Sequence, residues 1–211
     1  MKFTDGYWQM RPGVTALSPR SIAEIVVRDA AMVAHTPTRV IETRGDTLNC
    51  PALIITVDSP AEGVIGVTIE HWDQPSTGPS FALSGGGHEV SVVQGPDEVS
   101  LTSGSLTATL SRDVPWNLSF VGAGGPLTSS SGRSPSALTT PDGRRYVREQ
   151  LAIAPGEHLY GLGERFGPLI KNGQSVEIWN ADGGTSSEQA YKNVPFYLSD
   201  RGYGVFVDTP D

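Results

Sequence analysis

Hydrophobic and polar positions alternate over short stretches along most of the chain, and turn residues separate these stretches. Stretches rich in Val, Ile and Thr predict strands over Ser21–Arg28, Ala52–Asp58, Gly63–Trp72, His88–Val93, Glu98–Leu101, Leu106–Leu110, Trp116–Val121, Tyr146–Ile153, Ser175–Trp179, Pro195–Leu198 and Gly204–Asp208. No window keeps the 3.6-residue apolar period of a helix, although Ser186–Lys192 could form one helical turn. Short strands at such regular intervals favour an antiparallel sandwich or barrel over a βαβ sheet.

One stretch interrupts this pattern. Gly122–Asp142 is rich in Ser, Gly, Pro and Thr and has no clear alternation. Its composition suits either a linker between domains or a long hairpin loop. Because strand-like stretches continue on both sides, we expect the loop.

Composition supports the all-β prediction and narrows the classes of partner. The chain has 25 Gly and 16 Pro among 211 residues, which favours many short elements joined by turns. The net charge is -8, and no run of Lys or Arg exceeds Arg144–Arg145, so the sequence predicts no nucleic-acid partner. No stretch approaches the length of a membrane span, and the N-terminus has no signal-peptide h-region. With Cys50 as the one cysteine, we expect a cytoplasmic chain without an internal disulfide.

The Gly-x-Gly of Gly161–Gly163 matches the first two glycines of a dinucleotide-binding fingerprint. That fingerprint needs a third glycine where Phe166 stands, and it needs a helix that the pattern does not predict. We therefore expect a strand edge where the two glycines let another stretch of backbone approach closely. The four histidines are scattered without the spacing of metal ligands, so no metal site is expected.

The stretch after Ser175 combines aromatic side chains with an amide and an acid. Its members are Trp179, Asn180, Asp182, Tyr191, Phe196 and Tyr197. Aromatic faces stack on the C–H faces of sugars, and carboxylates and amides bond to sugar hydroxyls, so this combination suits carbohydrate recognition. The residues alone leave open that the aromatics are core residues of two strands. Candidate catalytic carboxylates also occur here, but no sequence context marks two of them as a glycosidase pair.

The two strings LYGLGERF and NGQSVEIWNADGGTSSEQAYKNVPFYLSDRGYGVFVD resemble the N-terminal region of glycoside hydrolase family 31, especially its bacterial α-xylosidases. MKFTDGYWQMRPGV and EGVIGVTIEHW also look like that branch. The resemblance covers nearly the whole chain and is densest over Tyr160–Asp208. It implies that residues 1–211 form one large antiparallel β-sandwich of the galactose-mutarotase-like type. In this family further strands follow the position of Asp208, so we expect the chain to end before the last strands of that domain.

The resemblance also implies a function. Enzymes of this family are retaining α-glycosidases that need no metal or organic cofactor, and their catalytic aspartates lie in a following (β/α)8 barrel. That barrel is absent here, so we expect no catalytic residue in this chain and no hydrolase activity from the chain alone. The implied partners are an α-linked xylosyl oligosaccharide or glycoside together with the barrel. Homo-oligomer formation stays open.

The resemblance also implies roles for individual residues, because in this family a loop of the N-terminal domain reaches over the mouth of the barrel. In the string WNADGGT, Asp182 is the expected acceptor for a sugar hydroxyl, flanked by Trp179 and Asn180. The expected supports of the loop or of the domain interface are Glu164, Arg165, Tyr191, Asn193 and Phe196. Two alternatives stay open: a free-standing carbohydrate-binding or mutarotase-like module, and a purely structural domain that packs on a barrel.

Overall fold

The protein is described by a computed structural model that covers residues 4–5, 9–71, 87–113, 115–179 and 192–209. The chain divides into two compact units, residues 2–152 and residues 153–211, and each is treated by itself. Every regular element in the described residues is an antiparallel strand, apart from one short 3-10 helix over Arg44–Thr47. The predicted all-β, galactose-mutarotase-like fold class is confirmed.

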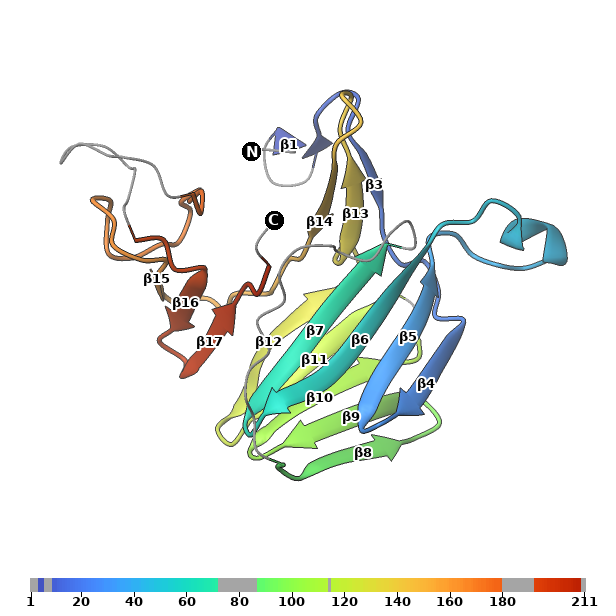
Figure 1. Ribbon diagram of the computed structural model, residues 1–211, viewed down its shortest axis with the longest axis horizontal. Coiled ribbons are helices and arrows are strands. Elements are labelled where there is room, and N and C mark those ends of the chain that lie inside the picture. The colour runs from blue at the N-terminus through green and yellow to red at the C-terminus, as the bar shows by residue number, and fades with distance from the viewer. Residues whose placement is uncertain (1–3, 6–8, 72–86, 114, 180–191, 210–211) are drawn as a thin grey trace. The chain divides into compact units, whose positions relative to one another are not determined.

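The first unit contains a sandwich of two antiparallel sheets (Figure 1). One sheet has the order β4-β5-β6-β7, with bounds Glu24–Arg28, Ala31–Pro37, Ala52–Ala61 and Val64–His71. The other sheet has the order β12-β11-β10-β9-β8, with bounds Gly125–Ser131, Asn117–Gly122, Leu106–Ser111, Glu98–Ser103 and Val90–Gln94. Neighbouring strands in each sheet follow one another in the sequence, so hairpins make the connections.

Alternating residues of these strands form the core between the two sheets. The buried apolar cluster is Ile25, Met32, Ala34, Leu53, Ile55, Val57, Val99, Leu101, Ala108, Leu110, Trp116, Leu118 and Ala137. In β6, for example, Leu53, Ile55 and Val57 point inward while the residues between them are only partly buried. This period of two is what half-buried strands require, and it is the signal on which the sequence prediction rested.

Polar side chains also connect the two sheets at one end of the sandwich. Ser59 on β6 donates to the buried Ser103 on β9 over 2.8 Å and lies 2.9 Å from Nε2 of His88. Ser103 in turn accepts a bond from the N–H of Gly63 in the β6–β7 turn. The buried hydroxyl of Ser103 therefore has hydrogen-bond partners at the place where the apolar core ends.

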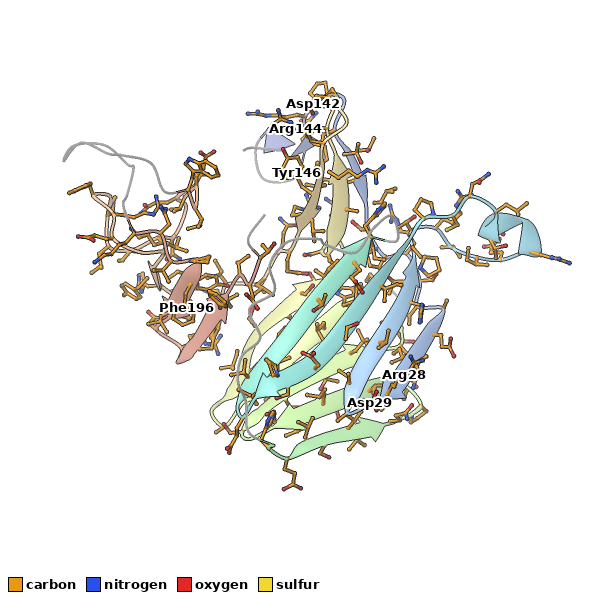
Figure 2. The ribbon with its side chains drawn as sticks, viewed as in Figure 1. Arg28, Asp29, Asp142, Arg144, Tyr146 and Phe196 are labelled. Atoms are coloured by element: carbon orange, nitrogen blue, oxygen red, sulfur yellow. The ribbon has the colours of Figure 1, made fainter. Side chains whose placement is uncertain are left out.

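Three shorter strands form a third sheet in this unit. Its order is β14-β13-β3, with bounds Arg145–Arg148, Ser136–Thr139 and Thr15–Leu17. Two further strands, β1 (Thr4–Asp5) and β2 (Gln9–Met10), pair with each other. Figure 2 labels Asp142 and Arg144 in the turn between β13 and β14, where Arg144 Nε lies 3.1 Å from an oxygen of Asp142.

Residues 153–209 hold the strands of the second unit. β15 (Leu159–Gly161), β16 (Phe196–Ser199) and β17 (Tyr203–Phe206) form a three-stranded antiparallel sheet. β16 lies in the middle, with Leu198 opposite Tyr160 on one side and opposite Gly204 on the other. β16 and the edge strand β17 are joined by the short turn at Asp200–Gly202.

The structure corrects three sequence-based expectations. Gly122–Asp142 is not a long loop, because it contains β12 and β13. β12 is an edge strand that pairs with β11 on one side and has an isolated bridge from Ser130 to Leu151 on the other, and such a strand tolerates Ser and Thr residues. Ser175–Trp179 is not a strand. A strand was also missed at Ala31–Pro37, where small and hydroxyl residues such as Ala34 and Thr36 occupy the buried positions.

The hairpin between β4 and β5 offers a test of backbone strain. Its two-residue turn has positive φ at both Asp29 (49°) and Ala30 (59°), as type I′ turns require. Ala30 is exposed and carries a Cβ in a region that favours glycine. We expect Ala30→Gly to raise the free energy of unfolding of the first unit by about 0.5–1 kcal/mol, measured by urea unfolding.

The matched control for this prediction is Ala31→Gly, one residue further along and inside β5. A glycine in a strand costs backbone entropy without relieving strain, so this variant should be less stable by about 0.5–1 kcal/mol. Equal destabilisation by both glycines would show that the turn at Ala30 is unstrained.

Candidate functional site

The Gly-x-Gly turn after β15 brings two distant stretches of backbone together. Gly161, Leu162 and Gly163 all have positive φ, at 110°, 68° and 88°. A Cβ on Gly163 would lie 2.2 Å from the carbonyl oxygen of Lys192, and one on Gly161 would lie 2.7 Å from that of Phe196. The expectation that these glycines permit close backbone approach is confirmed, and no side chain fits at Gly163.

Backbone hydrogen bonds use this close approach. The N–H of Leu162 donates to Phe196 O over 2.8 Å, and the N–H of Glu164 donates to Lys192 O over 3.0 Å. The turn is therefore tied to the residues that lead into β16. Glu164 itself is exposed and contributes its backbone to this contact.

Arg165 links three segments of this unit. Its Nε donates to Leu162 O over 3.0 Å, and its Nη2 donates to Glu177 O over 2.6 Å and to the side-chain oxygen of Asn193. The Asn193 amide nitrogen then donates to Trp179 O over 2.7 Å. Arg165 and Asn193 thus hold together the residues on either side of residues 180–191. We call this pair of side chains the Arg165–Asn193 clamp.

The structure brings some of the expected site residues together and leaves others undecided. Asn180, Asp182 and Tyr191 lie outside the described residues, as does most of the helical turn expected over Ser186–Lys192. Trp179 is 76% exposed, with its carbonyl held by Asn193. Phe196 is half-buried on β16, and its ring lies close against Gly204 (Figure 2).

A buried carboxylate that no sequence motif marks is central to the same unit. Glu157 is only 4% exposed. One of its oxygens accepts bonds of 2.6 Å from both the Ser199 hydroxyl and the Tyr203 hydroxyl. The other oxygen accepts a 2.8 Å bond from the N–H of Ala154. A single glutamate after a Pro-Gly turn carries no motif, so only the tertiary contacts reveal it.

Three more polar side chains extend this network around the start of β15. Asn172 donates to Glu157 O over 2.8 Å and accepts a 2.9 Å bond from the N–H of Leu159. His158 Nδ1 lies 2.9 Å from a carboxylate oxygen of Asp200, whose other oxygen accepts from the N–H of His158. The hydrogen bonds from the backbone N–H and the side chain of His158 lower the pKa of Asp200.

The network shifts the ionisation of its members in opposite directions. Burial by itself would raise the pKa of Glu157, but the bonds from Ser199, Tyr203 and the Ala154 N–H outweigh it, so that pKa is lowered. Burial and the bond to the Glu157 carboxylate raise the pKa of Tyr203 to about 12. Glu157 is therefore a charged acceptor at neutral pH, and Tyr203 is a neutral donor.

This pattern of charges fits a structural carboxylate better than a reactive one. A general acid near neutral pH needs a raised pKa, and the pKa of Glu157 is lowered. Both of its oxygens are also occupied by donors from the protein. Across the part of the chain that the structure describes, no group of three or more His, Cys, Asp or Glu could hold a metal ion.

The sequence comparisons bear on the whole chain. The model of the family described as "Glycosyl hydrolase 31 N-terminal galactose mutarotase-like domain" matches residues 54–211. The chain belongs to this family. It is 43% identical to the α-xylosidase XylQ of Lactiplantibacillus pentosus over 99% of the chain and 27% of that protein. It is also 43% identical to an α-xylosidase of Emericella nidulans, over 100% of the chain and 30% of that protein.

A solved structure shows the same fold at lower identity. The cycloalternan-forming enzyme of Listeria monocytogenes, in complex with a pentasaccharide substrate, matches 93% of this chain and 18% of its own, with a TM-score of 0.71 and 16% identity. The chain spans less than a third of the length of each α-xylosidase named above.

Within the described residues, no helix is long and apolar enough to cross a membrane.

The buried carboxylate gives a prediction for stability and its dependence on pH. We expect Glu157→Gln to lower the free energy of unfolding of the second unit by about 1–3 kcal/mol near neutral pH, because a neutral amide replaces a charged acceptor. A lowered carboxyl pKa stabilises the fold above the ordinary value of 4.5, and this stabilisation is lost as the pH falls through the lowered pKa. The difference in free energy of unfolding between the unmodified chain and Glu157→Gln, which we call the gap, should therefore become smaller in acid.

Urea unfolding at neutral and acidic pH measures this gap, and hydrogen exchange of the β16 and β17 amides at neutral pH assigns the loss to the second unit. Glu164→Gln removes an exposed carboxylate from the same unit and serves as the control. A gap that stays constant across the acidic range would contradict the role given to the Glu157 charge.

Proposed function

We propose that the chain is the non-catalytic N-terminal domain of a retaining α-glycosidase that hydrolyses terminal α-linked xylose. The observation that carries this proposal is the 43% identity to two α-xylosidases over 99% and 100% of the chain. Because the chain spans only 27% and 30% of those proteins, the bond-breaking aspartates are proposed to lie outside it, in a barrel domain. Hydrolysis there would proceed through a covalent glycosyl–enzyme intermediate.

The contribution of this chain to that reaction would be to complete the substrate-binding site. We assign Asp182 as an acceptor for a sugar hydroxyl, and Trp179 and Asn180 as its neighbours on the same loop. An indole stacks on the C–H face of a sugar ring, and the high exposure of Trp179 leaves its ring available for such a contact. These residues would bind and orient the substrate without taking part in bond cleavage.

The Arg165–Asn193 clamp supports this assignment through its position. It bonds to the carbonyls of Glu177 and Trp179 on one side of residues 180–191, and Asn193 itself lies on the other side. A loop whose two ends are held by a guanidinium and an amide loses less entropy when it binds a ligand. We therefore assign Arg165 and Asn193 as positioning residues, with Gly163 giving the backbone room to pass.

The first test asks whether the chain acts alone. We expect the purified 211-residue chain to release no p-nitrophenol from p-nitrophenyl α-xyloside, because the nucleophile and the acid/base would be missing. Turnover that disappears in Asp182→Ala would overturn the proposal. Sub-millimolar binding of xylose or a xylosyl disaccharide to the isolated chain, measured by calorimetry, would instead favour a free-standing carbohydrate-binding or mutarotase-like module.

The second test asks whether the loop matters in a complete enzyme. For this we define a chimaera in which the chain replaces the matched part of the L. pentosus α-xylosidase. We expect Asp182→Asn to lower its kcat/KM for an α-xyloside by about tenfold, equivalent to one hydrogen bond to a charged group. Steady-state kinetics on both proteins measure this change.

The matched control is Asp142→Asn in the turn between β13 and β14, where the carboxylate is exposed and pairs with Arg144. Surface pairs of this kind contribute little, so its kinetics should equal those of the unmodified chimaera. If Asp182→Asn also left the kinetics unchanged, the chain would be a purely structural module.

A further inference from the structure

A turn in the second unit contains an asparagine that is followed by glycine. The five asparagines of the chain are Asn49, Asn117, Asn172, Asn180 and Asn193, and in the sequence only Asn172 precedes a glycine. Asparagine is chemically labile, because the next backbone nitrogen can attack its side-chain amide. Gly173 is exposed and has no side chain to shield its nitrogen, and nothing lies within 4 Å of the place that a Cβ would take. The pair Asn172–Gly173 therefore has the local chemistry of intramolecular deamidation.

The folded turn holds the two reacting atoms out of position. The N–H of Gln174 donates to Lys171 O over 3.1 Å. Gly173 has a φ of 71°, and Asn172 is not among the residues with positive φ. This combination is that of a type II turn, whose second residue has a ψ of about +120°. Ring closure needs the Gly173 nitrogen to lie in one plane with Cα, Cβ and Cγ of Asn172, and this ψ keeps the nitrogen outside that plane.

Hydrogen bonds to the start of β15 also fix the Asn172 side chain. Its Nδ2 donates to Glu157 O over 2.8 Å, and its Oδ1 accepts a 2.9 Å bond from the N–H of Leu159. The N–H of Lys171 donates to Leu159 O over 2.8 Å, so the backbone of the turn is bound to the same place. Rotation of Asn172 into a reactive geometry therefore requires these bonds to open.

The buried carboxylate of Glu157 holds the other side of this contact. Its oxygens accept bonds from Ser199, Tyr203 and the N–H of Ala154, which fix the residue whose carbonyl Asn172 contacts. The reactivity of Asn172 is thus linked to the network around Glu157.

We propose that Asn172 is a site of covalent self-modification that the folded unit holds inactive and that reacts when the start of β15 opens. The backbone nitrogen of Gly173 gives its proton to hydroxide and attacks Cγ of Asn172. The Cγ–Nδ2 bond then breaks, and the nitrogen takes a proton from water and leaves as ammonia, so that a five-membered succinimide remains. Water opens this ring at either carbonyl and gives an aspartate or an isoaspartate. This inference does not depend on the proposed function.

Either product prevents the original contacts from forming again. A carboxylate has no donor, so the bond to Glu157 O is lost and a negative charge faces that carbonyl. An isoaspartate also adds one carbon to the main chain, which disrupts the turn bond between Gln174 and Lys171. The modification therefore makes an otherwise reversible opening of this part of the unit permanent.

Mass spectrometry of the 211-residue chain tests the proposal. Cleavage after Glu164 and Glu177 releases residues 165–177, in which Asn172 is the one asparagine. The chain is incubated at mildly alkaline pH beside a synthetic peptide of residues 165–177, and formation of aspartate and isoaspartate is followed over time. We expect the folded chain to react at least about tenfold more slowly than the peptide, because only the open fraction reacts.

Two variants open the network by different amounts. Glu157→Gln removes the charged acceptor and should bring the rate to within about threefold of the peptide rate. Tyr203→Phe removes one donor to Glu157 and should give a rate between those of the unmodified chain and Glu157→Gln. The control is Glu62→Gln, which changes an exposed glutamate in the turn between β6 and β7 and should react like the unmodified chain.

Hydrogen exchange tests the consequence of the modification. Asn172→Asp reproduces one of its two products and should speed exchange of the β15 and β16 amides by at least about tenfold. Asn117→Asp makes the same change at an exposed residue of β11 and should leave these amides unaffected.

Three outcomes would overturn the proposal. A folded chain that reacts as fast as the peptide would show that the fold does not hold Asn172 inactive. Equal rates in the unmodified chain, Glu157→Gln and Tyr203→Phe would show that the network does not control the reaction. Unchanged amide exchange in Asn172→Asp would show that the modified unit closes as before.

Discussion

The Glu157 carboxylate is the interaction on which the second unit depends. It accepts bonds from the start of the unit at Ala154, from the end of β16 at Ser199 and from the start of β17 at Tyr203. A buried charge without partners would cost several kcal/mol, so each donor is needed to keep the group ionised inside the unit. The bonds from Ser199 and Tyr203, which lie directly opposite each other, bring the end of β16 and the start of β17 onto the same carboxylate oxygen.

The two units are stabilised by different means. In residues 2–152 the apolar cluster between two sheets provides a conventional hydrophobic core. Among the described residues of 153–209 the buried side chains are polar, and hydrogen bonds, whose net contribution per bond is small, set the geometry. Polar networks of this kind specify an arrangement more strongly than they stabilise it.

The fold could be predicted from the sequence wherever apolar residues alternate clearly. β6, β7 and β10 lie where Val, Ile and Leu recur at every second position. β5 was missed because Ala34 and Thr36 occupy buried positions without an obvious hydrophobic signal. β12 was mistaken for part of a loop because Ser or Thr occupies four of its seven positions, as an edge strand permits. These errors arise because pairing with a neighbour, which local sequence does not record, decides whether a weak strand forms.

The residues of the candidate site also differ in whether the sequence alone could identify them. Gly161 and Gly163 could be interpreted from the sequence because close backbone approach demands residues without a Cβ. The sugar-binding assignment of Asp182 needed the family resemblance, since an acid beside aromatics is equally compatible with a strand core. Glu157 could be found by neither route, because its role depends on Ser199 and Tyr203, more than 40 residues away in the sequence.

The Arg165–Asn193 clamp was identified from the family resemblance together with the contacts in the structure. The family resemblance selected Arg165 and Asn193, and the structure defines their contacts. Nη2 of the planar Arg165 guanidinium donates to two acceptors, and the Asn193 amide both accepts and donates. Lysine could not replace Arg165, because a single ammonium cannot bridge the Leu162, Glu177 and Asn193 oxygens in a fixed plane. The clamp is attached through Leu162 to the sheet that Glu157 organises, so a buried charge helps to hold the described residues on either side of residues 180–191.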